Sequence, residues 1–340
     1  MENYLQNKEV ILSVKDLDVR FSLRGKSLHA IRGVSLDVYK GESLAIVGES
    51  GSGKSVLTKN FIGLLDKNGT IDKGEILFEG MDLAKFKTER EWAKIRGKKI
   101  AMVMQDPMTS LNPLKTIGWQ ISEALILNRG MNHAQAKAET LNILKDVGIS
   151  EPERRYKQYP HEFSGGMRQR VVIAIAVACS PEILICDEPT TALDVTIQAQ
   201  ILELMKDLQK KVNTSIIMIT HDLGVIASMC SRIVVMYGGC VAETGTTREI
   251  FYSPKHPYTW GLLRSIPKAQ MDGTHSKLLP IPGTPPDMLR PPKGCPFAPR
   301  CKSCMKVCLN KMPPRTELSD THYTYCWLRQ KEEFEKGGKA

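Results

Sequence analysis

One stretch of the sequence decides the fold: residues 44–57 read LAIVGESGSGKSVL. Its first four residues form an unbroken apolar run, which is typical of a strand buried on both faces of a parallel sheet. The next eight fit the pattern G-x-x-x-x-G-K-[ST], and apolar residues that suit a helix follow. Glycines in such a loop allow backbone N–H groups to surround phosphate oxygens, and the helix N-terminus adds its positive dipole. The stretch therefore predicts a nucleotide-phosphate site.

All residues of this loop are candidates for contact with a nucleotide. The Lys54 side chain would reach the β- and γ-phosphates, and the Ser55 hydroxyl would ligate Mg²⁺. The candidates are Gly48, Glu49, Ser50, Gly51, Ser52, Gly53, Lys54 and Ser55.

Two further apolar runs, ILIC at 183–186 and IIMI at 216–219, lie on either side of a segment at 195–212 with apolar residues at helical spacing. Strand, helix and strand in this order predict a parallel α/β sheet. Asp187 and Glu188 follow the first run, and His221 follows the second. Because sites in such sheets gather at the carboxyl ends of strands, Asp187 can hold Mg²⁺ and Glu188 can activate a water. Taken alone, a surface acid and a core or capping histidine are the commoner explanations of these residues.

Ser164, Gly165 and Gly166 precede a second apolar segment, residues 171–178. A helix that begins Ser-Gly-Gly offers bare N–H groups and a hydroxyl to an anion. An ordinary N-cap with a glycine turn is the alternative.

The rest of the chain divides by its pattern. Residues 10–38 alternate as three short strands, with Gly25 and Gly33 as expected turns. Residues 117–147 have the spacing of amphipathic helices and look inserted. Beyond about residue 253 the chain is rich in proline and cysteine and has little periodicity, so we expect an accessory tail without a core of its own.

Composition and charge exclude several classes. A chain of 340 residues with 42% hydrophobic and 25% charged residues is neither disordered nor fibrous. No apolar run approaches the ~20 residues of a membrane span, and acidic residues near the start predict no secretory signal, so we expect the chain to stay inside the cell. The net charge of +10 suits nucleic acid, an anionic membrane face or a phosphate-rich ligand, and equally a solvated basic surface.

Nine cysteines are unusual for an intracellular chain. Those at 179, 186, 230 and 240 sit among apolar residues and are interpreted as small core residues. The other five crowd into residues 295–326, where disulfides are unexpected in a reducing compartment. Their spacing suits zinc, with His322 or Cys326 as the last of four ligands, and it equally suits an iron–sulfur cluster. Free thiols are the third alternative.

Taken together, the motifs resemble the ATP-binding subunits of ABC transporters. The resemblance rests on their order along the chain: the phosphate loop, Gln105, Ser164-Gly165-Gly166, Asp187-Glu188, Asp194 and His221. The stretches SGGMRQRVVIAIAVACSPEILICDEPTTALDVTIQAQIL and SPKHPYTWGLLRSIP are similar to oligopeptide/dipeptide importer ATPases of the OppD/DppD type. The implied cofactors are ATP and Mg²⁺.

The resemblance also implies roles for single residues. Glu188 is the general base, Asp187 supports Mg²⁺, Gln105 senses Mg²⁺ and the attacking water, and His221 contacts the γ-phosphate. A second set would act at the edges of the site. Ser164, Gly165 and Gly166 would close over ATP bound to a partner subunit, Asp194 would lie at the dimer seam, and Phe21 would stack on adenine.

In the tail, residues 294–301 read GCPFAPRC, and Cys308 and Cys326 follow. This pattern resembles one that binds a [4Fe-4S] cluster in the importer ATPases, which implies Cys295, Cys301, Cys308 and Cys326 as ligands. Cys304 is an extra thiol that the pattern does not explain.

The implied fold is α/β, a P-loop NTPase of the ABC ATPase type. We expect a mixed sheet core, an N-terminal antiparallel β subdomain, an inserted helical subdomain and an irregular tail rich in cysteine and proline. The ATPase domain would span residues 1–253, with the helical subdomain at about 106–163, and the tail would span residues 254–340.

The implied function is the ATP-hydrolysing motor of a membrane importer for di- or oligopeptides, at the cytoplasmic face of the cell membrane. Its partners would be a second ATPase subunit, two transmembrane permease subunits and, through the complex, an extracytoplasmic substrate-binding protein, with no nucleic acid. A homodimer stays open, as do nickel and oligosaccharides as cargo. A soluble ABC ATPase that acts on nucleic acid or the ribosome usually has two cassettes or a long coiled coil, which this chain lacks. A small-molecule P-loop kinase would not explain Ser164-Gly165-Gly166.

Overall fold

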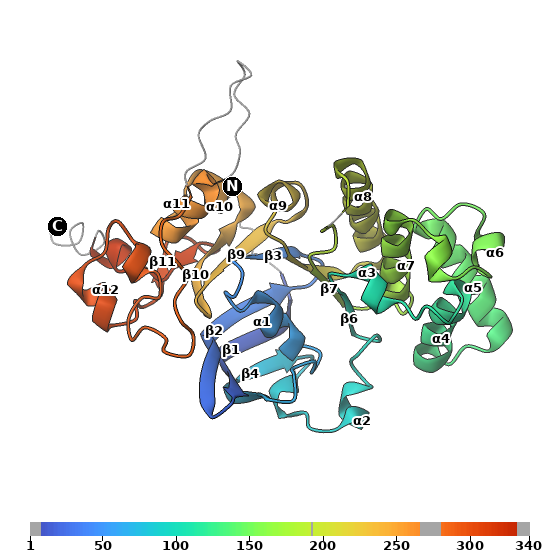
Figure 1. Ribbon diagram of the computed structural model, residues 1–340, viewed down its shortest axis with the longest axis horizontal. Helices are drawn as coiled ribbons and strands as arrows, with labels where there is room; N and C mark the ends of the chain where they lie inside the picture. Colours follow the sequence, from blue (N-terminus) through green and yellow to red (C-terminus); the bar gives the residue numbers. More distant parts are fainter. Residues whose placement is uncertain (1–7, 192, 266–279, 332–340) are drawn as a thin grey trace, which may run out of the picture. The chain divides into compact units, whose positions relative to one another are not determined.

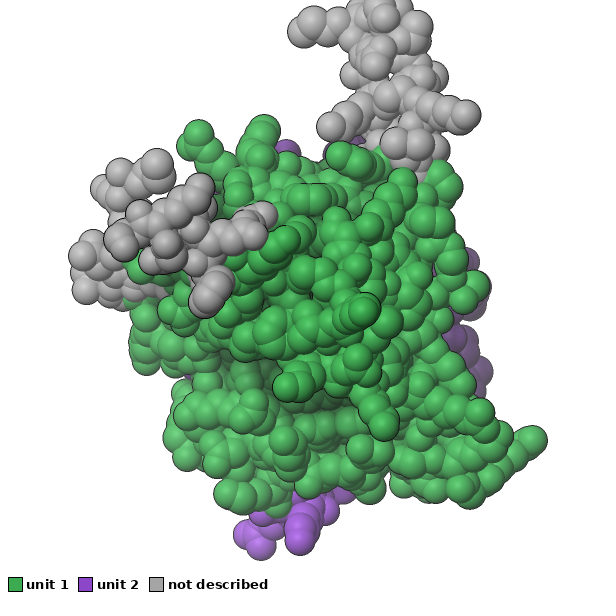
Figure 2. Space-filling view, turned by 90° about the vertical axis from the view of Figure 1, so that its left-hand side faces the viewer, with its two compact units in different colours: residues 1–39, 44–85, 221–340 green, residues 40–43, 86–220 purple. Residues whose placement is uncertain are grey.

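The computed structural model describes residues 8–191, 193–265 and 280–331. The chain forms two compact units, which Figure 2 shows in green and purple. Unit 1 comprises residues 1–39, 44–85 and 221–340, and unit 2 comprises residues 40–43 and 86–220. The domains expected from the sequence, 1–253 and 254–340, include residues 1–7, 192, 266–279 and 332–340, which lie outside the described residues.

The N-terminal part of unit 1 is an antiparallel sheet with the strand order β2-β1-β4-β5 (Figure 1). Its strands are β1 (Val10–Leu23), β2 (Lys26–Tyr39), β4 (Gly69–Phe78) and β5 (Met81–Asp82). Gly25 lies in the turn between β1 and β2, as predicted. The turn predicted at Gly33 is wrong, because this residue lies inside β2 at φ 61°, where the register with β1 shifts. The predicted turn is a β-bulge, and two long strands replace the three short ones.

Unit 1 also contains the strands β11-β12-β10-β9-β3 in this order. Strand β3 (Ser43–Val47) is buried along its whole length and runs parallel to β9 (Arg232–Tyr237). The remaining strands are β10 (Cys240–Thr246), β11 (Thr316–Glu317) and β12 (Tyr323–Thr324). The helices of this unit are α1 (Lys54–Asn60), η1 (Leu83–Lys85), α9 (Leu223–Met229), α10 (Thr247–Tyr252), α11 (Pro257–Arg264), η3 (Ala298–Arg300) and α12 (Lys306–Asn310).

Unit 2 is built on three parallel strands, in the order β8-β7-β6. They are β6 (Ile100–Val103), β7 (Ile183–Asp187) and β8 (Ser215–Ile219). Helix α8 (Val195–Val212) connects β7 to β8, as the spacing predicted. The other helices are α2 (Glu89–Trp92), α3 (Pro107–Ser110), α4 (Ile117–Arg129), α5 (His133–Asp146), α6 (Pro152–Arg155), η2 (Pro160–Glu162) and α7 (Gly165–Val177). Figure 1 shows α4, α5, α6 and α7 gathered together.

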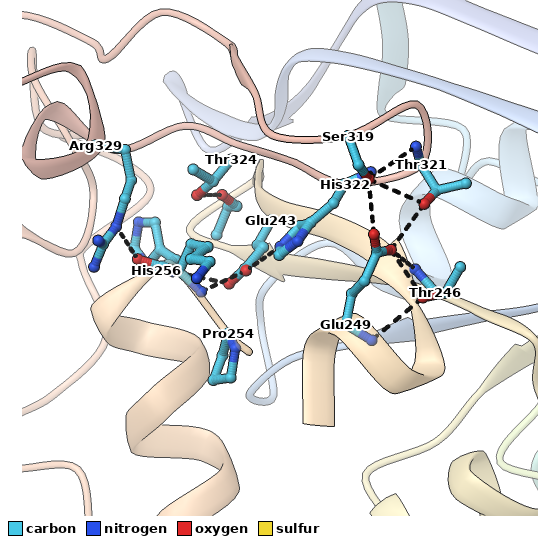
Figure 3. Close-up of polar contacts among 12 residues, drawn as sticks. Glu243, Thr246, Glu249, Pro254, His256, Ser319, Thr321, His322, Thr324 and Arg329 are labelled. Atoms are coloured by element: carbon cyan, nitrogen blue, oxygen red, sulfur yellow. Dashed lines mark hydrogen bonds and ion pairs between the residues drawn. The ribbon is translucent and has the colours of Figure 1, made fainter. Parts of the chain in front are cut away.

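The C-terminal tail is fixed to β10 and α10 by two glutamates (Figure 3). Glu243 is fully buried; it accepts hydrogen bonds from the Lys255 and His256 amides at 2.6 and 2.9 Å and lies 2.7 Å from His322 Nε2. Glu249 accepts from the hydroxyls of Ser319 and Thr321, at 2.7 and 2.8 Å. The tail, which has little regular structure, is therefore held by polar side chains of the strand and helix beneath it.

Among the residues that the structure describes, no helix has the length and apolar character that a membrane span requires.

Candidate functional site

The phosphate loop, residues 48–55, connects the buried strand β3 to α1 as the sequence predicted. Two of its glycines cannot be replaced without disturbing the backbone. Gly48 has φ 151°, and a Cβ there would lie 2.1 Å from the Met236 carbonyl oxygen. Gly53 has φ 98°, and a Cβ there would lie 2.9 Å from the Ala30 carbonyl oxygen. The tight path of the loop therefore depends on glycine at both ends.

The ammonium group of Lys54 lies inside this loop. Its Nζ donates hydrogen bonds to the carbonyl oxygens of Gly48 and Glu49, at 2.7 and 3.0 Å, and to the Ser52 hydroxyl at 3.5 Å. The residue is only 9% exposed. A buried cation in a glycine-rich loop at a helix N-terminus provides the positive potential that binds phosphate.

In unit 2, the structure brings Glu188 and Gln105 together. Glu188 follows β7, and its Oε2 accepts a hydrogen bond from Gln105 Nε2 at 2.9 Å and another from the Thr191 hydroxyl at 3.0 Å. Its own amide donates to the Ile219 carbonyl at 2.8 Å. The carboxylate is therefore held at the carboxyl end of a parallel strand, where a general base would stand.

The other polar candidate residues lie at the ends of strands or next to the start of a helix. Asp187 is the last residue of β7, and His221 is exposed and lies just before the N-cap of α9, Asp222. The phosphate loop and His221 belong to unit 1, whereas Gln105, Asp187 and Glu188 belong to unit 2.

Ser164 is the N-cap of α7, and its hydroxyl accepts from the Met167 amide at 3.4 Å. Gly166 faces α8, where an added Cβ would lie 2.6 Å from Ile197 Cγ2. Asp194 is the N-cap of α8 and accepts from the Ile197 amide at 3.0 Å. These residues have the structural roles that the sequence allowed, and their roles toward ATP and a partner subunit stay predictions.

Phe21 lies in β1 and is 9% exposed. Its ring lies against Gly69, where an added Cβ would come within 2.7 Å of Phe21 Cε1. Stacking on adenine requires an exposed ring face, and this role also stays a prediction.

A small cavity of about 20 Å³ in the tail brings the four candidate cysteines together. Its lining includes Cys295, Cys301, Cys308 and Cys326. Cys304 is exposed and does not line the cavity. The structure therefore separates the four thiols that the resemblance implied from the extra one. No group of three or more His, Cys, Asp or Glu side chains is arranged to share a metal ion within the described ranges.

Burial favours the neutral form of three of these thiols. It raises the pKa of Cys295 to about 12 and that of Cys301 to about 11, and it raises the pKa of Cys326 as well. Because a metal ligand must be a thiolate, a cation would have to supply the energy that deprotonates them. The zinc ligand set that uses His322 is wrong, because His322 Nε2 contacts Glu243 and the residue does not line the cavity.

Three residues near the candidate site were not found by sequence reasoning. Thr191 contacts Glu188, and Tyr258 and Arg300 contact the phosphate loop from the tail. All three residues lie in stretches that resemble the importer ATPases, but Arg300 appears there only as part of the GCPFAPRC stretch around the cysteines. Thr191 and Tyr258 carry no pattern that points to a nucleotide.

A glycine-rich phosphate loop and a carboxylate at the end of a parallel strand define a P-loop nucleotide hydrolase. Two family models match the chain: "ABC transporter" over residues 31–191, and "Oligopeptide/dipeptide transporter, C-terminal region" over residues 242–308. Together with the relatives described next, they show that the chain belongs to the ABC transporter family, as an ATPase subunit.

The relatives span almost the whole chain. The dipeptide transport ATP-binding protein DppD of Bacillus subtilis is 53% identical over 94% of this chain and 95% of its own length. The oligopeptide transport ATP-binding protein OppD of the same organism is 56% identical over 94% of this chain and 88% of its own length. OppD of Salmonella typhimurium is 48% identical over 95% of both chains.

Solved structures agree on the fold. A dimeric ATP-binding cassette in a post-hydrolysis state, bound to ADP and Pi, has a TM-score of 0.62 and 30% identity, and the match covers 70% of this chain and 99% of that one. The protein cbiO1 of Clostridium perfringens, part of an ABC transporter complex, has a TM-score of 0.62 and 29% identity, with 72% and 92% covered. The predicted family and fold class are confirmed.

Proposed function

We propose that the chain is the ATP-hydrolysing motor subunit of an importer for dipeptides or oligopeptides. The observation that carries the proposal is its C-terminal region, since residues 242–308 match the family model of oligopeptide and dipeptide transporters. The named relatives, which transport dipeptides and oligopeptides, support the same cargo. A soluble ATPase that acts on nucleic acid or the ribosome is not favoured by any relative described here.

The chemistry that we propose is hydrolysis of ATP at the phosphate loop. Residues 48–53 and Lys54 hold the phosphates, and Ser55, Asp187 and Gln105 hold or sense Mg²⁺, which would offset the negative charge of the phosphates. Glu188 takes a proton from the water as its oxygen bonds to the γ-phosphorus and the bond to the β–γ bridging oxygen breaks. The hydrogen bond between Gln105 and Glu188 supports this assignment, because it aims the carboxylate. His221 would contact the γ-phosphate.

Closure of two ATPase subunits would complete the site. Ser164, Gly165 and Gly166 stand at the N-terminus of the 13-residue helix α7 and would contact ATP on the partner subunit, with Asp194 at the seam. The partners proposed are a second, different ATPase subunit, two transmembrane permease subunits and a substrate-binding protein. The subunit would therefore work at the cytoplasmic face of the membrane. ATP favours the closed dimer, and hydrolysis removes that bias.

We propose the division into an ATPase domain over 1–253, with a helical subdomain at about 106–163, and a tail over 254–340. The tail would hold a [4Fe-4S] cluster through Cys295, Cys301, Cys308 and Cys326, with zinc as the alternative. Four thiols, which are the donors that either group would use, line one cavity, and this supports the proposal. A cluster there would act as a structural staple for a tail that has little regular structure.

Analysis of bound metal tests the tail site. Protein purified without oxygen should contain about four iron and four sulfide per chain and absorb near 400 nm, and Cys308→Ser should lose both. Cys304→Ser is the matched control and should keep them, because this thiol is exposed. One zinc per chain without sulfide would show that the site holds zinc and not an iron–sulfur cluster. Native protein without any metal would contradict both the cluster and the zinc site.

Uptake of labelled peptides tests the transport function. Cells that lack the chain should lose uptake, and the native chain should restore it. Glu188→Gln should not restore it, because the amide cannot accept the proton of the attacking water. Glu203→Gln, the same change at an exposed position of α8, should restore uptake fully. Restoration by Glu188→Gln would refute the catalytic base, and unchanged uptake after deletion would lead to the same assay with nickel and oligosaccharides.

A further inference from the structure

The tail contacts the phosphate loop through one arginine. Arg300 ends η3, directly before the candidate ligand Cys301, and only 5% of its side chain is exposed. Its guanidinium forms a bidentate ion pair with the second residue of the loop: Nη1 donates to Glu49 Oε2 at 2.6 Å, and Nη2 donates to Glu49 Oε1 at 3.0 Å. This planar fork is the strongest geometry of a charged hydrogen bond between side chains.

The other guanidinium hydrogens are also bonded. Nη1 donates to the Tyr237 hydroxyl at 3.0 Å, Nη2 to the Ile281 carbonyl at 3.1 Å, and Nε to the Pro282 carbonyl at 2.8 Å. Arginine has five N–H donors, and all of them are used here. Lysine has three donors on a single nitrogen and cannot reproduce this arrangement.

Glu49 is held at three points, and one of them leads to the phosphate-binding lysine. Its carboxylate accepts from Arg300, and its amide donates to the hydroxyl of the buried Tyr258 at 2.8 Å. Its carbonyl oxygen accepts from Lys54 Nζ at 3.0 Å. A displaced Glu49 would therefore displace the Lys54 ammonium.

Charge gives Arg300 a second effect on the loop. Glu49 places a carboxylate in a loop whose ligand is a polyanion, and an unpaired carboxylate there would repel the phosphates. The Arg300 guanidinium cancels that charge at hydrogen-bond distance. Removal of Arg300 therefore both loosens the loop and leaves a partly buried negative charge unpaired.

We propose that Arg300 is a positioning residue for the phosphate loop, through which the cysteine-bearing tail sets the affinity of the loop for nucleotide. The inference deepens the proposed function and rests on it, since it requires that residues 48–55 bind ATP.

Equilibrium titration of the purified full-length chain with a fluorescent ATP analogue and Mg²⁺ tests the proposal. R300A should raise the Kd about tenfold or more, as expected for the loss of a bidentate ion pair whose arginine is buried. R300K should fall between R300A and the native chain, because it keeps the charge and loses the fork; it also serves if R300A does not fold. The double variant R300A/E49Q should bind more tightly than R300A, because it removes the unpaired carboxylate.

A tail arginine away from the loop is the matched control. Arg315 pairs with Glu317 at 3.2 Å and lies 3.9 Å from the centroid of the Tyr323 ring. R315A should keep the native Kd, even where it lowers the melting temperature.

Two results would overturn the proposal. Equal Kd values for R300A and the native chain would leave Arg300 as an anchor of the tail alone, and R300A/E49Q no tighter than R300A would remove the role of Glu49. If the native chain itself failed to bind the analogue, the proposed function would fall, and this inference with it.

Discussion

Glu188 has a backbone conformation that few residues other than glycine adopt, with φ 47°. Such a conformation costs about 1–3 kcal/mol and persists only where the surroundings fix it. Here the amide is held by the Ile219 carbonyl, and the carboxylate is held by Gln105 and Thr191. The backbone strain is therefore located at the residue proposed as the general base, which agrees with the rule that strained residues gather at functional sites.

Gly166→Ala tests the packing of the Ser-Gly-Gly segment. The new methyl group would lie 2.6 Å from Ile197 Cγ2, and relieving this overlap should cost about 1–3 kcal/mol of unfolding free energy. Chemical denaturation with urea measures the loss. Gly165→Ala is the control, since its nearest neighbour would be Leu193 Cδ2 at 3.9 Å. Equal stabilities of the two variants would contradict the packing argument.

At this scale, the sequence predicts the phosphate loop and the acid after β7, because both are local patterns. It does not predict what holds Glu49. Arg300 and Glu49 lie 251 positions apart, and the bond depends on how the tail folds back. A role that arises from contact between distant residues leaves no periodic or spaced signal.

Single helices and strands agree with the sequence-based prediction where the spacing of their apolar residues is regular. Helix α8 spans Val195–Val212, as the spacing of its apolar residues predicted, since one face is buried and the other is in solvent. The error at Gly33 has a physical cause. A tight turn and a β-bulge both use glycine at positive φ, and the residue alone does not distinguish them.

Asp194→Ala tests the start of α8. The carboxylate accepts from the Ile197 amide at 3.0 Å, and its loss should cost about 1 kcal/mol of unfolding free energy. Asp194→Asn should keep most of that stability, because an amide oxygen also caps. The same denaturation assay compares the two variants. If Asp194→Ala were as stable as Asp194→Asn, the cap would contribute nothing to stability. Only the proposed role of Asp194 at the dimer seam would then remain.

On the scale of the whole molecule, stability should depend on pH through the network that holds the tail (Figure 3). Burial lowers the pKa of His256 to about 4, and its neutral Nδ1 accepts from the Tyr258 amide at 3.0 Å. Burial alone would raise the pKa of Glu243, but hydrogen bonds from His322 and from the Lys255 and His256 amides outweigh it and lower the pKa. Both groups have a folded pKa below the unfolded one, so acid removes the stability that each contributes.

His256→Asn tests the histidine. In the native chain, the buried neutral His256 does not reduce the free energy of unfolding above about pH 6.5, the ordinary pKa of histidine. As the pH drops from there toward about 4, the unfolded chain binds a proton at this residue that the folded chain does not, and the free energy of unfolding falls. Asparagine also caps α11 but does not titrate, so the melting temperature of the variant should fall less between pH 6.5 and 4.5. The exposed His133 supplies the control, because His133→Asn should leave the native pH profile unchanged. Parallel profiles for native and His256→Asn would contradict the assignment.

The tail was the least predictable region from sequence. Its partners are side chains of β10, α10 and the phosphate loop, and most of its residues belong to no regular element that a period could reveal. The clustering of its cysteines was visible in advance. Their common cavity, and the exclusion of Cys304 from it, come from the folded path of the chain.

The ion pair between Glu49 and Arg300 also determines when, during synthesis of the chain, the phosphate loop can reach its final form. The chain is synthesised from its N-terminus at about 5–20 residues per second, and the two partners are 251 positions apart. A nascent chain therefore carries its phosphate loop without Arg300 for roughly 10–50 seconds. Tight nucleotide binding would therefore begin only after Arg300 has been synthesised and has folded back onto the loop, and chains truncated before residue 300 would bind nucleotide weakly.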